Sequence, residues 1–438
     1  MASSLLLPLQ TASTALICSR EQTTGEYDFA GISKTVSNKH NRLDNASFLA
    51  NVKVGESDKK GGRGLFTTSP LKAGDLILCE KAFLVSFHSD AEAETYTIMN
   101  LNTNVGVMGT QATLMFNLTQ KTLHNPTAAA RFFDLFDGGY IPKCKVPQVD
   151  GVTVVDTFQL AAIREHNAFG CPNVRSTDNH DPSEMDHDPR SATGIWITAS
   201  YINHACDGNA IRSFIGDLMI VRATKDIPEG VEITMPYRMA EADNKETRKA
   251  LEKTWGFKCA CELCVVEMKT GGSHASKRRQ LLTEAEALLE NNPQNARAQP
   301  PSKELMAKAQ RLYDQLAATY DKTLFKAMPR LGLIDLGLWL INAQTKNANP
   351  KDVVDRAIET LRNCGYVIEM KGREVKVDHQ HCFTHAAAED AAVHAAHALV
   401  FNGDDVLGKQ FEELAKKLYV TRLGELRGYE DRYGGSRT

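Results

Sequence analysis

The chain has 438 residues, enough for two or three domains, because one domain usually takes about 150 residues. Its 51 Lys and Arg residues against 54 Asp and Glu give a net charge of −3, which excludes attraction to nucleic acid or membrane surfaces by overall charge. The longest apolar stretches, such as residues 331–341, fall far short of the roughly 20 residues that span a bilayer. The 10 cysteines are too sparse for a disulfide-stapled secreted protein.

The N-terminal sequence lacks the pattern of a secretory leader. A short apolar run precedes Arg20, and no basic residue comes before it, whereas a signal peptide begins with positive charge. We predict that residues 1–45 form a mostly disordered tail, with a transit peptide as the alternative.

Strand and helix patterns alternate along the next part of the chain. Residues 48–87 alternate runs of β-forming residues with glycine and lysine turns, which predicts several short strands. Apolar residues then recur at helical spacing, so we expect a helical insertion at about residues 88–165. Strand patterns return at residues 194–203 and 210–227, where Gly216–Asp217 is typical of a hairpin turn.

Helical patterns occupy the chain beyond Cys264. Stretches such as residues 302–325 and 352–365 repeat apolar residues along one helix face. There is no clean repeat of about 34 residues, but the lengths suit paired antiparallel helices. We therefore predict an all-helical C-terminal domain similar to a tetratricopeptide stack.

Three cysteines are spaced closely enough to bind one metal ion. Cys259, Cys261 and Cys264 form a C-x-C-x-x-C motif, and a tetrahedral zinc site needs a fourth ligand at about 2.3 Å. Cys206 is the candidate for that ligand. The alternative is that the three cysteines are ordinary reduced thiols.

Two polar residues end an otherwise apolar strand pattern. Asn203 and His204 directly follow Tyr201 and Ile202, and a buried polar group without a partner would cost roughly 1 to 3 kcal/mol. Taken alone, the pattern favours an asparagine that caps a turn and a core histidine with its hydrogen bonds satisfied.

Four segments in this order resemble the SET-domain protein lysine methyltransferases, and more closely the SMYD-like subgroup with its fungal relatives. They are GRGLFTTSPLKAGDLILCEKAF (62–83), NAFG (167–170), ASYINHACDGNA (199–210) with IPEGVEITMPY (227–237), and WGFKCACELC (255–264). Each could arise by chance, but the set is specific.

The resemblance implies an α+β fold with a β-rich SET core of small sheets. In that core the Asn203–His204 strand is threaded as a pseudoknot beneath the loop that ends at Tyr237. We expect the SET domain at residues 46–240, with the helical insertion inside it. A post-SET segment at 241–268 would hold one structural zinc ion on the four cysteines, and the helical domain would follow at 269–438.

The resemblance also assigns roles to individual residues. S-adenosylmethionine would be contacted by Arg63, Gly64, Leu65, Asn167, Ser200, Asn203, His204, Tyr237 and Phe257. The channel for the target lysine would be lined by Phe169, Tyr201 and Trp255. Read without the family, the glycine-rich turn around Gly64 is simply a turn between strands.

Tyr237 is the residue that we expect to carry the chemistry. Methyl transfer needs a neutral amine, and a free lysine titrates near about 10.4. A dry aromatic channel disfavours the ammonium form, and the Tyr237 hydroxyl could align the amine with the methyl group. The alternative is a tyrosine that caps the core at a strand end.

The sequence departs from the family pattern in three places. Gly208 stands where proline is common, and Ala205 replaces a frequent serine. The insertion at 88–165 contains only Cys144, so it cannot hold the zinc ions of a MYND finger. We therefore expect a SET core without a MYND module.

These observations predict an S-adenosylmethionine-dependent protein-lysine N-methyltransferase with a histone or non-histone substrate. The alternatives are a catalytically inactive scaffold that binds partners through its helices, and a methyltransferase of a small amine or peptide metabolite. We expect a monomer without direct nucleic-acid or membrane partners, in the nucleus, the cytoplasm or both. The basic run at 277–279 fits either a nuclear signal or, more simply, a solvated helix start.

Overall fold

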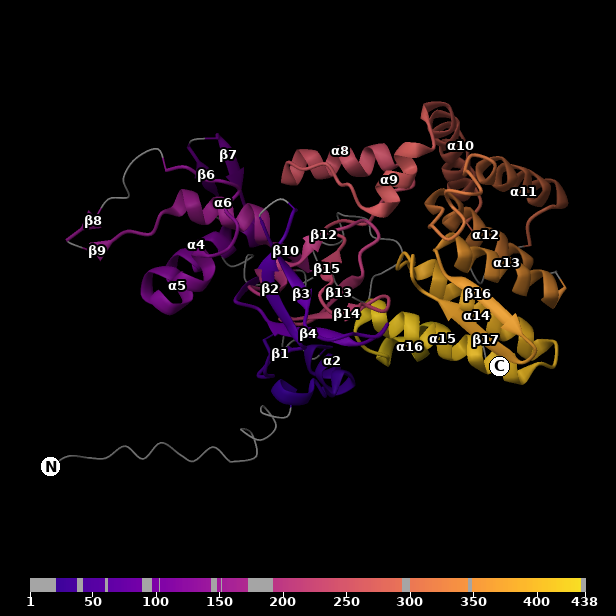
Figure 1. Cartoon of the computed structure of the whole chain (residues 1–438), viewed down its shortest axis with the longest axis horizontal. Coiled ribbons are helices and arrows are strands. Elements are labelled where there is room, and N and C mark those ends of the chain that lie inside the picture. Colours follow the sequence, from indigo (N-terminus) through magenta and orange to yellow (C-terminus); the bar gives the residue numbers. More distant parts are fainter. Residues whose placement is uncertain are drawn as a thin grey trace. The chain divides into compact units, whose positions relative to one another are not determined.

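A computed structural model of the chain describes most of its residues, and the helices and strands are labelled in Figure 1. The described residues are 21–37, 42–59, 62–88, 97–101, 103–142, 148–150, 152–171, 192–293, 300–345 and 349–434. They combine small β-sheets with many helices, so the predicted α+β class is confirmed. Within these ranges, no helix has both the length and the apolar character that crossing a membrane requires.

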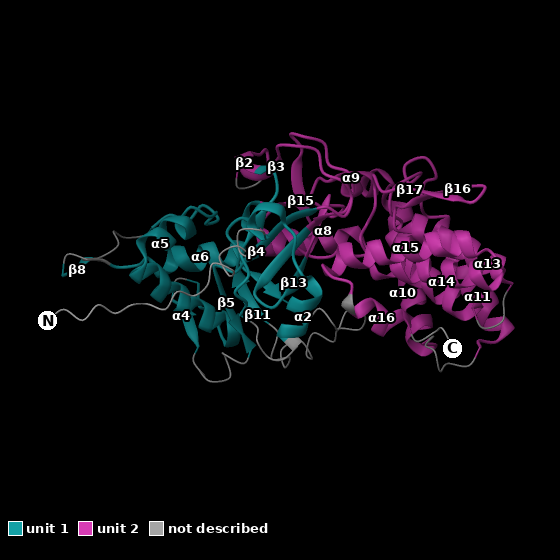
Figure 2. Cartoon of the chain, turned by 90° about the horizontal axis from the view of Figure 1, so that it is seen from below, with its two compact units in different colours: residues 1–52, 76–201, 213–221 teal, residues 53–75, 202–212, 222–438 magenta. Residues whose placement is uncertain are grey.

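The chain divides into two compact units, and each unit is built from segments that are distant in sequence (Figure 2). Unit 1 consists of residues 1–52, 76–201 and 213–221, and unit 2 of residues 53–75, 202–212 and 222–438. Because both units are discontinuous, this division does not test the predicted domain boundaries at 240 and 268. Those boundaries remain predictions.

Unit 1 contains most of the residues of two sheets, with the strand orders β1-β4-β14-β13 and β10-β11-β5. The strands are β1 (Phe48–Leu49), β4 (Leu76–Lys81), β5 (Leu84–Phe87), β10 (Phe169–Cys171), β11 (Ala192–Ile195), β13 (Ala210–Ile215) and β14 (Leu218–Ala223). Gly216 lies between β13 and β14 with a φ of 59°, a conformation that glycine adopts without steric cost. The predicted hairpin turn is therefore present.

The helices of unit 1 pack in two apolar clusters. They are α2 (Phe29–Ser37), α4 (Gly109–His124), α5 (Pro126–Phe133) and α6 (Thr157–Asn167). Leu114, Phe132 and Ile163 from the last three helices are fully buried in one cluster. Helices therefore occur where the insertion was predicted, and the same region also forms two short hairpins. Their strands are β6 (Ile98–Asn100), β7 (Val105–Val107), β8 (Gln148–Val149) and β9 (Val152–Thr153).

Helix α2 corrects the prediction of a disordered tail over residues 1–45. Ile32 of this helix is buried in a cluster with Leu43 and Cys79, and the Leu43 N–H donates to Asp217 Oδ1 at 3.0 Å. The physical reason is the helical spacing of Phe29, Ile32 and Val36, which gives α2 an apolar face that packs on unit 1. Residues 1–20 and 38–41 of the predicted tail lie outside the described residues.

The sheet of unit 2 brings three distant segments together, in the strand order β12-β15-β3-β2. The strands are β2 (Val52–Glu56), β3 (Arg63–Thr67), β12 (Asn203–His204) and β15 (Glu232–Met235). β12 runs parallel to β15, with Asn203 opposite Thr234 and His204 opposite Met235. β15 runs antiparallel to β3. The short strand β12 therefore lies beside the segment that leads to Tyr237, as the threaded arrangement requires.

Helices make up most of the rest of unit 2. They are α8 (Asn244–Trp255), α9 (Glu262–Lys269), α10 (Gly272–Asn291), α11 (Lys303–Ala317), η2 (Leu331–Leu333), α12 (Ile334–Gln344), α13 (Pro350–Asn363), α14 (Ala386–Phe401), α15 (Asp405–Leu423) and α16 (Arg427–Tyr433). Consecutive helices from α10 to α15 contact one another. The resemblance to a tetratricopeptide stack stays a prediction.

A β-hairpin interrupts these helices, so the prediction of an all-helical C-terminal domain is wrong in this place. Strand β16 (Val367–Lys371) pairs antiparallel with β17 (Glu374–Asp378). Gly372 has a φ of 62° in the turn between them. In β17, half-buried valines alternate with exposed charged residues, which is the period of a strand and not of a helix.

Candidate functional site

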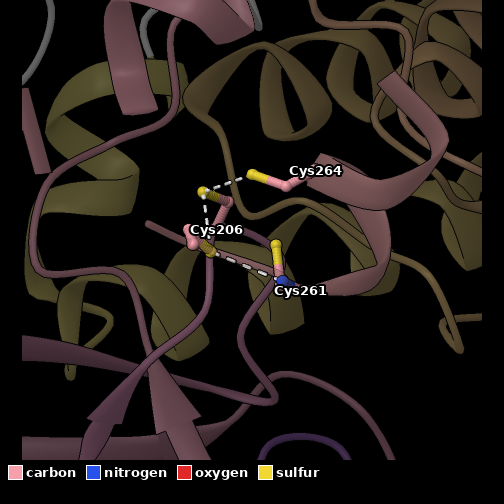
Figure 3. Close-up of side chains that lie close together, drawn as sticks. Cys206, Cys261 and Cys264 are labelled. Carbon is pink, nitrogen blue, oxygen red and sulfur yellow. Dashed lines mark hydrogen bonds between the residues drawn. The ribbon is translucent and has the colours of Figure 1, made fainter. Parts of the chain in front are cut away.

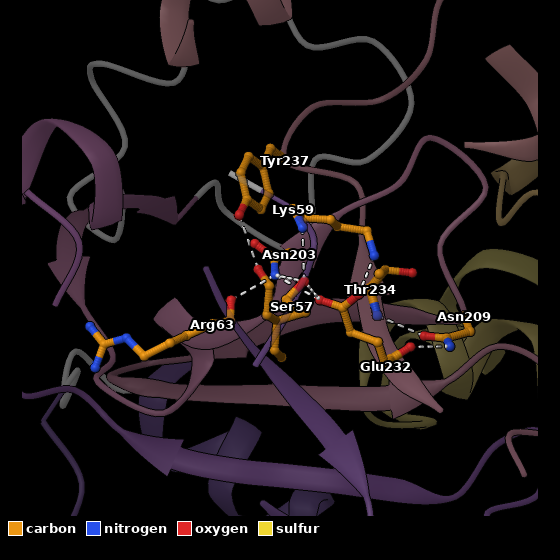
Figure 4. A network of polar contacts seen from close by, with 9 residues as sticks. Ser57, Lys59, Arg63, Asn203, Asn209, Glu232, Thr234 and Tyr237 are labelled. Atoms are coloured by element: carbon orange, nitrogen blue, oxygen red, sulfur yellow. Dashed lines mark hydrogen bonds and ion pairs between the residues drawn. The ribbon is translucent and has the colours of Figure 1, made fainter. Parts of the chain in front are cut away.

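The two polar residues of β12 are both buried, and Asn203 has found partners in unit 2. Asn203 is 7% exposed. Its side-chain amide donates to the Arg63 carbonyl at 2.8 Å and to Glu232 Oε1 at 2.7 Å (Figure 4). These hydrogen bonds remove the cost of burying the amide, and they join β12 to β3 and β15.

Glu232 is the centre of this polar network, and the sequence analysis did not single it out. Its carboxylate accepts a hydrogen bond from Ser57 Oγ at 2.8 Å and forms an ion pair with Lys59 (Figure 4). The Glu232 side chain is 12% exposed, so the charge is partly shielded from water. One signal was available: Glu232 is the acidic residue at the start of the apolar run that leads to Tyr237.

Gly64 lies where the backbone of β3 approaches this network. A Cβ atom added to Gly64 would lie 2.3 Å from Glu232 Oε1 and 3.1 Å from Asn203 Nδ2. Any larger residue would therefore displace the carboxylate or the amide. Leu65 is 1% exposed, so its side chain belongs to the core.

His204 connects the tyrosine loop to the cysteine motif. Its Nδ1 atom accepts a hydrogen bond from the Tyr237 N–H at 3.0 Å, which assigns the ring proton to Nε2 when the imidazole is neutral. Nε2 lies 3.4 Å from Cys206 Sγ. The ring therefore accepts on the tyrosine side and donates toward the sulfur.

Tyr237 directs its hydroxyl back toward the chain that precedes β12. The hydroxyl donates to the Ile202 carbonyl at 3.1 Å. Burial raises the pKa of Tyr237 to about 12, so the phenol is neutral at physiological pH. The Arg212 guanidinium donates to the Pro236 and Tyr237 carbonyls and fixes the backbone of the loop.

Aromatic rings surround the Tyr237 ring. Its centroid lies 5.5 Å from that of Trp255, 6.3 Å from that of Phe257 and 5.3 Å from that of His204. Trp255 is the last residue of α8, where Gly256 has a φ of 68° and ends the helix. The turn after α8 thus returns Phe257 to the same aromatic cluster.

The four predicted cysteines converge in unit 2. The sulfur atoms of Cys206, Cys259, Cys261 and Cys264 all lie within 4.8 Å of one another, and three of these residues are labelled in Figure 3. Hydrogen bonds among the thiols lower the pKa of Cys259 and Cys264 and raise the pKa of Cys206 and Cys261, so two of the four sulfurs favour the thiolate that binds metals. This donor set fits a tetrahedral zinc ion.

Four of the predicted site residues belong to unit 1. The Asn167 amide donates to the Phe136 and Ile163 carbonyls, each at 2.7 Å, so this amide is held at the end of α6. The remaining three are placed by their own contacts. The Phe169 ring packs against Trp196, Ser200 Oγ donates to the Trp196 carbonyl at 2.8 Å, and the Tyr201 hydroxyl donates to Asp134.

Unit 2 therefore assembles the larger part of the predicted site. Its described residues include the first residues of β3, the β12 pair, Tyr237, the aromatic residues Trp255 and Phe257, and the four cysteines. Asn167, Phe169, Ser200 and Tyr201 lie in unit 1. Asn209, which the sequence analysis also missed, supports β15 by accepting the Thr234 N–H at 2.8 Å and donating to the Glu232 carbonyl at 2.9 Å.

Comparison with known proteins gives a family for this region. Residues 62–238 match the family model described as SET domain. A Gibberella zeae protein named Methyltransferase is 37% identical over 311 residues, which cover 68% of this chain and 41% of the relative. Histone-lysine N-methyltransferase ASHR2 of Arabidopsis thaliana is 33% identical over 118 residues, covering 25% of this chain and 28% of the relative.

A human relative also matches part of this chain, and a solved structure aligns along most of it. Histone-lysine N-methyltransferase SMYD3 of Homo sapiens is 34% identical over 76 residues, covering 17% of this chain and 18% of the relative. The chain thus spans less than half the length of these curated relatives. A solved structure of the SET domain of LSMT aligns with 94% of this chain, and the alignment includes 97% of the LSMT chain at 11% identity. The TM-score of this alignment is 0.29, which is too low to support a structural comparison.

Proposed function

Because this chain carries a SET domain at residues 62–238, we propose that it is an S-adenosylmethionine-dependent protein-lysine N-methyltransferase. The names of the relatives from Gibberella zeae, Arabidopsis thaliana and Homo sapiens support this activity. The observation that carries the proposal is the neutral, partly buried hydroxyl of Tyr237, which lies against the Ile202 carbonyl beside the polar pair of β12.

The polar network fits the amino-acid end of S-adenosylmethionine. Asn203 offers an amide, Glu232 a carboxylate, and Gly64 a strand backbone without a side chain. These groups match a ligand that carries both an ammonium and a carboxylate group. We assign the backbone of Arg63 and Leu65 to the same end, and His204 and Phe257 to the neighbouring wall. When bound, the cofactor supplies a methyl group on a sulfonium.

Tyr237 and its aromatic neighbours would prepare the lysine. The Tyr237 proton is directed to the Ile202 carbonyl, so a lone pair of the phenol oxygen is available to accept a hydrogen bond from an amine. The rings of Trp255 and Phe257 exclude water and disfavour the ammonium form of lysine, whose ordinary pKa is about 10.4. The chain would thus present a neutral and oriented amine.

One structural zinc ion would be held by Cys206, Cys259, Cys261 and Cys264. Their chemistry and convergence support this site. Cys206 lies two residues after β12, and Cys259 lies two residues after Phe257. Zinc would therefore tie the end of the cofactor strand to the aromatic wall around Tyr237.

Four further assignments, all in unit 1, rest on the family pattern alone. We assign Asn167 and Ser200 to cofactor contacts, and Phe169 and Tyr201 to the lysine channel, on the basis of the family pattern. The substrate would be a lysine side chain of a histone or non-histone protein. The same proposal includes that the protein acts as a monomer, in the nucleus, the cytoplasm or both. It also includes that the protein has no direct nucleic-acid or membrane partners.

Labelled methyl transfer tests this function. The wild-type protein is incubated with methyl-labelled S-adenosylmethionine and a host-cell extract, and the labelled product is hydrolysed to amino acids. The proposal expects label in methyl-lysine from the wild type and little from Tyr237→Phe. Label absent from every protein would favour the inactive scaffold, whereas label in a small amine would favour the metabolite methyltransferase.

A further inference from the structure

A second feature of unit 2 lies outside the polar network and the cysteine motif. Helices α8, α9 and α10 enclose a cleft of about 580 Å³. Its lining is rich in charge, and three carboxylates contribute to it. Each carboxylate already has a cationic partner. The pairs are Asp243 with Arg279, Glu252 with Lys258, and Glu267 with Arg278.

Three further cations line the cleft from one face of α8. Lys245, Arg248 and Lys249 have the three- and four-residue spacing that places side chains side by side on a helix. Lys249 lies 3.8 Å from Glu246, but both side chains are at least half exposed, so water and salt weaken this pair. The cleft thus has more positive than negative charge after its own pairs are counted.

Arg248 is the residue that points most clearly to a ligand. One of its terminal nitrogens lies 2.8 Å from the Met268 sulfur, a weak acceptor. Its Nε atom is buried and has no hydrogen-bond partner among the described residues. Its terminal nitrogens make only the contact with the Met268 sulfur among the described residues, and a carboxylate in the cleft is the group that best satisfies the fork-shaped geometry of a guanidinium. The N-terminal residues Gly271 and Gly272 of α10 line the same cleft and add partial positive charge.

We propose that this cleft binds acidic residues of the protein substrate, an inference that rests on the proposed methyltransferase function. Trp255, whose ring lies 5.5 Å from that of Tyr237, is seven positions after Arg248 and ten after Lys245 on the same helix. At about 1.5 Å per residue, these positions lie about 10 and 15 Å along the axis from Trp255.

That separation sets where the acidic residues stand in the substrate. An extended peptide covers about 3.3 Å per residue, so carboxylates about three to five positions from the target lysine reach the α8 cations. A peptide fits the cleft better than nucleic acid. Only three cations line the cleft beyond its own ion pairs, which suits a few single carboxylates of a peptide better than a chain with a phosphate at every unit.

Peptide binding in the absence of S-adenosylmethionine tests the cleft alone. Fluorescence anisotropy would measure the affinity of a lysine-free peptide of Glu and Gly and that of the same peptide with every Glu replaced by Gln. Both affinities would be measured at about 50 and about 300 mM salt. The acidic peptide should bind at least about fivefold more tightly than the neutral one, with the difference shrinking at high salt. Arg248→Gln should remove at least half of that preference. A single-stranded oligonucleotide that binds in place of the acidic peptide would overturn the choice of ligand.

Lys253→Gln is the matched control, because Lys253 lies on α8 and is exposed but does not line the cleft. An equal loss of binding in Lys253→Gln and Arg248→Gln would mean that the peptide is attracted by general charge, and this would overturn the proposal. Unchanged binding in Arg248→Gln would also overturn it. Methylation assays separate this test from that of the function. If the acidic peptide binds through Arg248 but no lysine peptide is methylated, the cleft stands and the proposed enzyme activity fails.

Discussion

Two regions of unit 2 are stabilised by different kinds of contact. One is the sheet β12-β15-β3-β2, and the other is the set of C-terminal helices. In the sheet, Asn203 donates to the Arg63 carbonyl across 140 positions, and Ser57 donates to Glu232 across 175 positions. In the helices, neighbours along the chain contact one another, their buried residues are mostly apolar, and most of the alanines of α14 are buried.

This difference separates function from stability in the molecule. A change in the sheet leaves a buried polar group without its partner or moves a site residue, because each group there has a specific contact. A change in the helical core removes apolar contacts and leaves the site residues in place. We therefore expect substitutions in the two regions to give different combinations of stability, zinc content and activity.

Loss of the metal should have the largest effect on the sheet. The wild type should contain one zinc ion per chain by elemental analysis, and Cys261→Ser should lose it and unfold the region around β12. Structural zinc contributes folding energy directly, about 10 to 16 kcal/mol in isolated zinc-finger peptides. Cys364→Ala, a change at a buried cysteine of the helical region, should keep the ion. Wild-type protein without zinc would contradict the role of the four cysteines.

Removal of one hydroxyl should separate chemistry from binding. Tyr237→Phe should lower the rate of methyl transfer roughly 100- to 1000-fold, the usual cost of removing one aligned polar group at a reacting centre, while S-adenosylmethionine still binds. Steady-state rates and cofactor titrations measure the two effects. Tyr320→Phe is the control, because Tyr320 is also a buried phenol with a hydrogen bond, from the Gly332 N–H. A fully active Tyr237→Phe enzyme would refute the assigned role.

A cavity in the helical core should reduce stability without changing the site. Leu340 in α12 is 0% exposed, so Leu340→Ala should lower the free energy of unfolding by about 2 to 5 kcal/mol. Denaturant unfolding measures this loss, and the folded variant should keep its zinc and its rate of methyl transfer. If the rate falls as it does in Tyr237→Phe, the two regions are not independent.

A single methyl group at Gly64 should have the smallest effect of this series. Gly64→Ala places a Cβ against the Glu232 carboxylate, and such crowding costs about 1 to 3 kcal/mol. We expect binding of S-adenosylmethionine to weaken about tenfold or more, as measured by calorimetry. Gly170→Ala is the control, because a Cβ at Gly170 would meet nothing within 4 Å. Unchanged affinity in Gly64→Ala would remove the β3 backbone from the proposed binding site.

Short motifs in the sequence were sufficient to predict that four cysteines meet in unit 2. The C-x-C-x-x-C spacing and Cys206 predicted a group of four thiols, and the structure contains it. The turn at Gly216 was also predictable, because glycine and aspartate between two strand patterns favour a hairpin. Such motifs work because a local spacing already limits which groups can share a ligand or a turn.

Other features depended on contacts that no local pattern contains. Glu232 is one acidic residue in a strand, and its importance follows from Ser57 and Lys59, which lie more than 170 positions earlier. The apolar spacing of Phe29 and Ile32 was the local signal for helix α2, but its packing against Leu43 and Cys79 could not be predicted from that spacing alone. The hairpin at β16 and β17 was missed among helices, although its alternating valines carried the signal.

Calorimetric titration of the wild-type protein with S-adenosylmethionine tests most directly whether unit 2 forms a methyl-donor site. The account predicts saturable binding of one molecule per chain, weakened in Gly64→Ala and retained in Tyr237→Phe. A folded, zinc-containing protein that gives no heat at concentrations far above micromolar would contradict it.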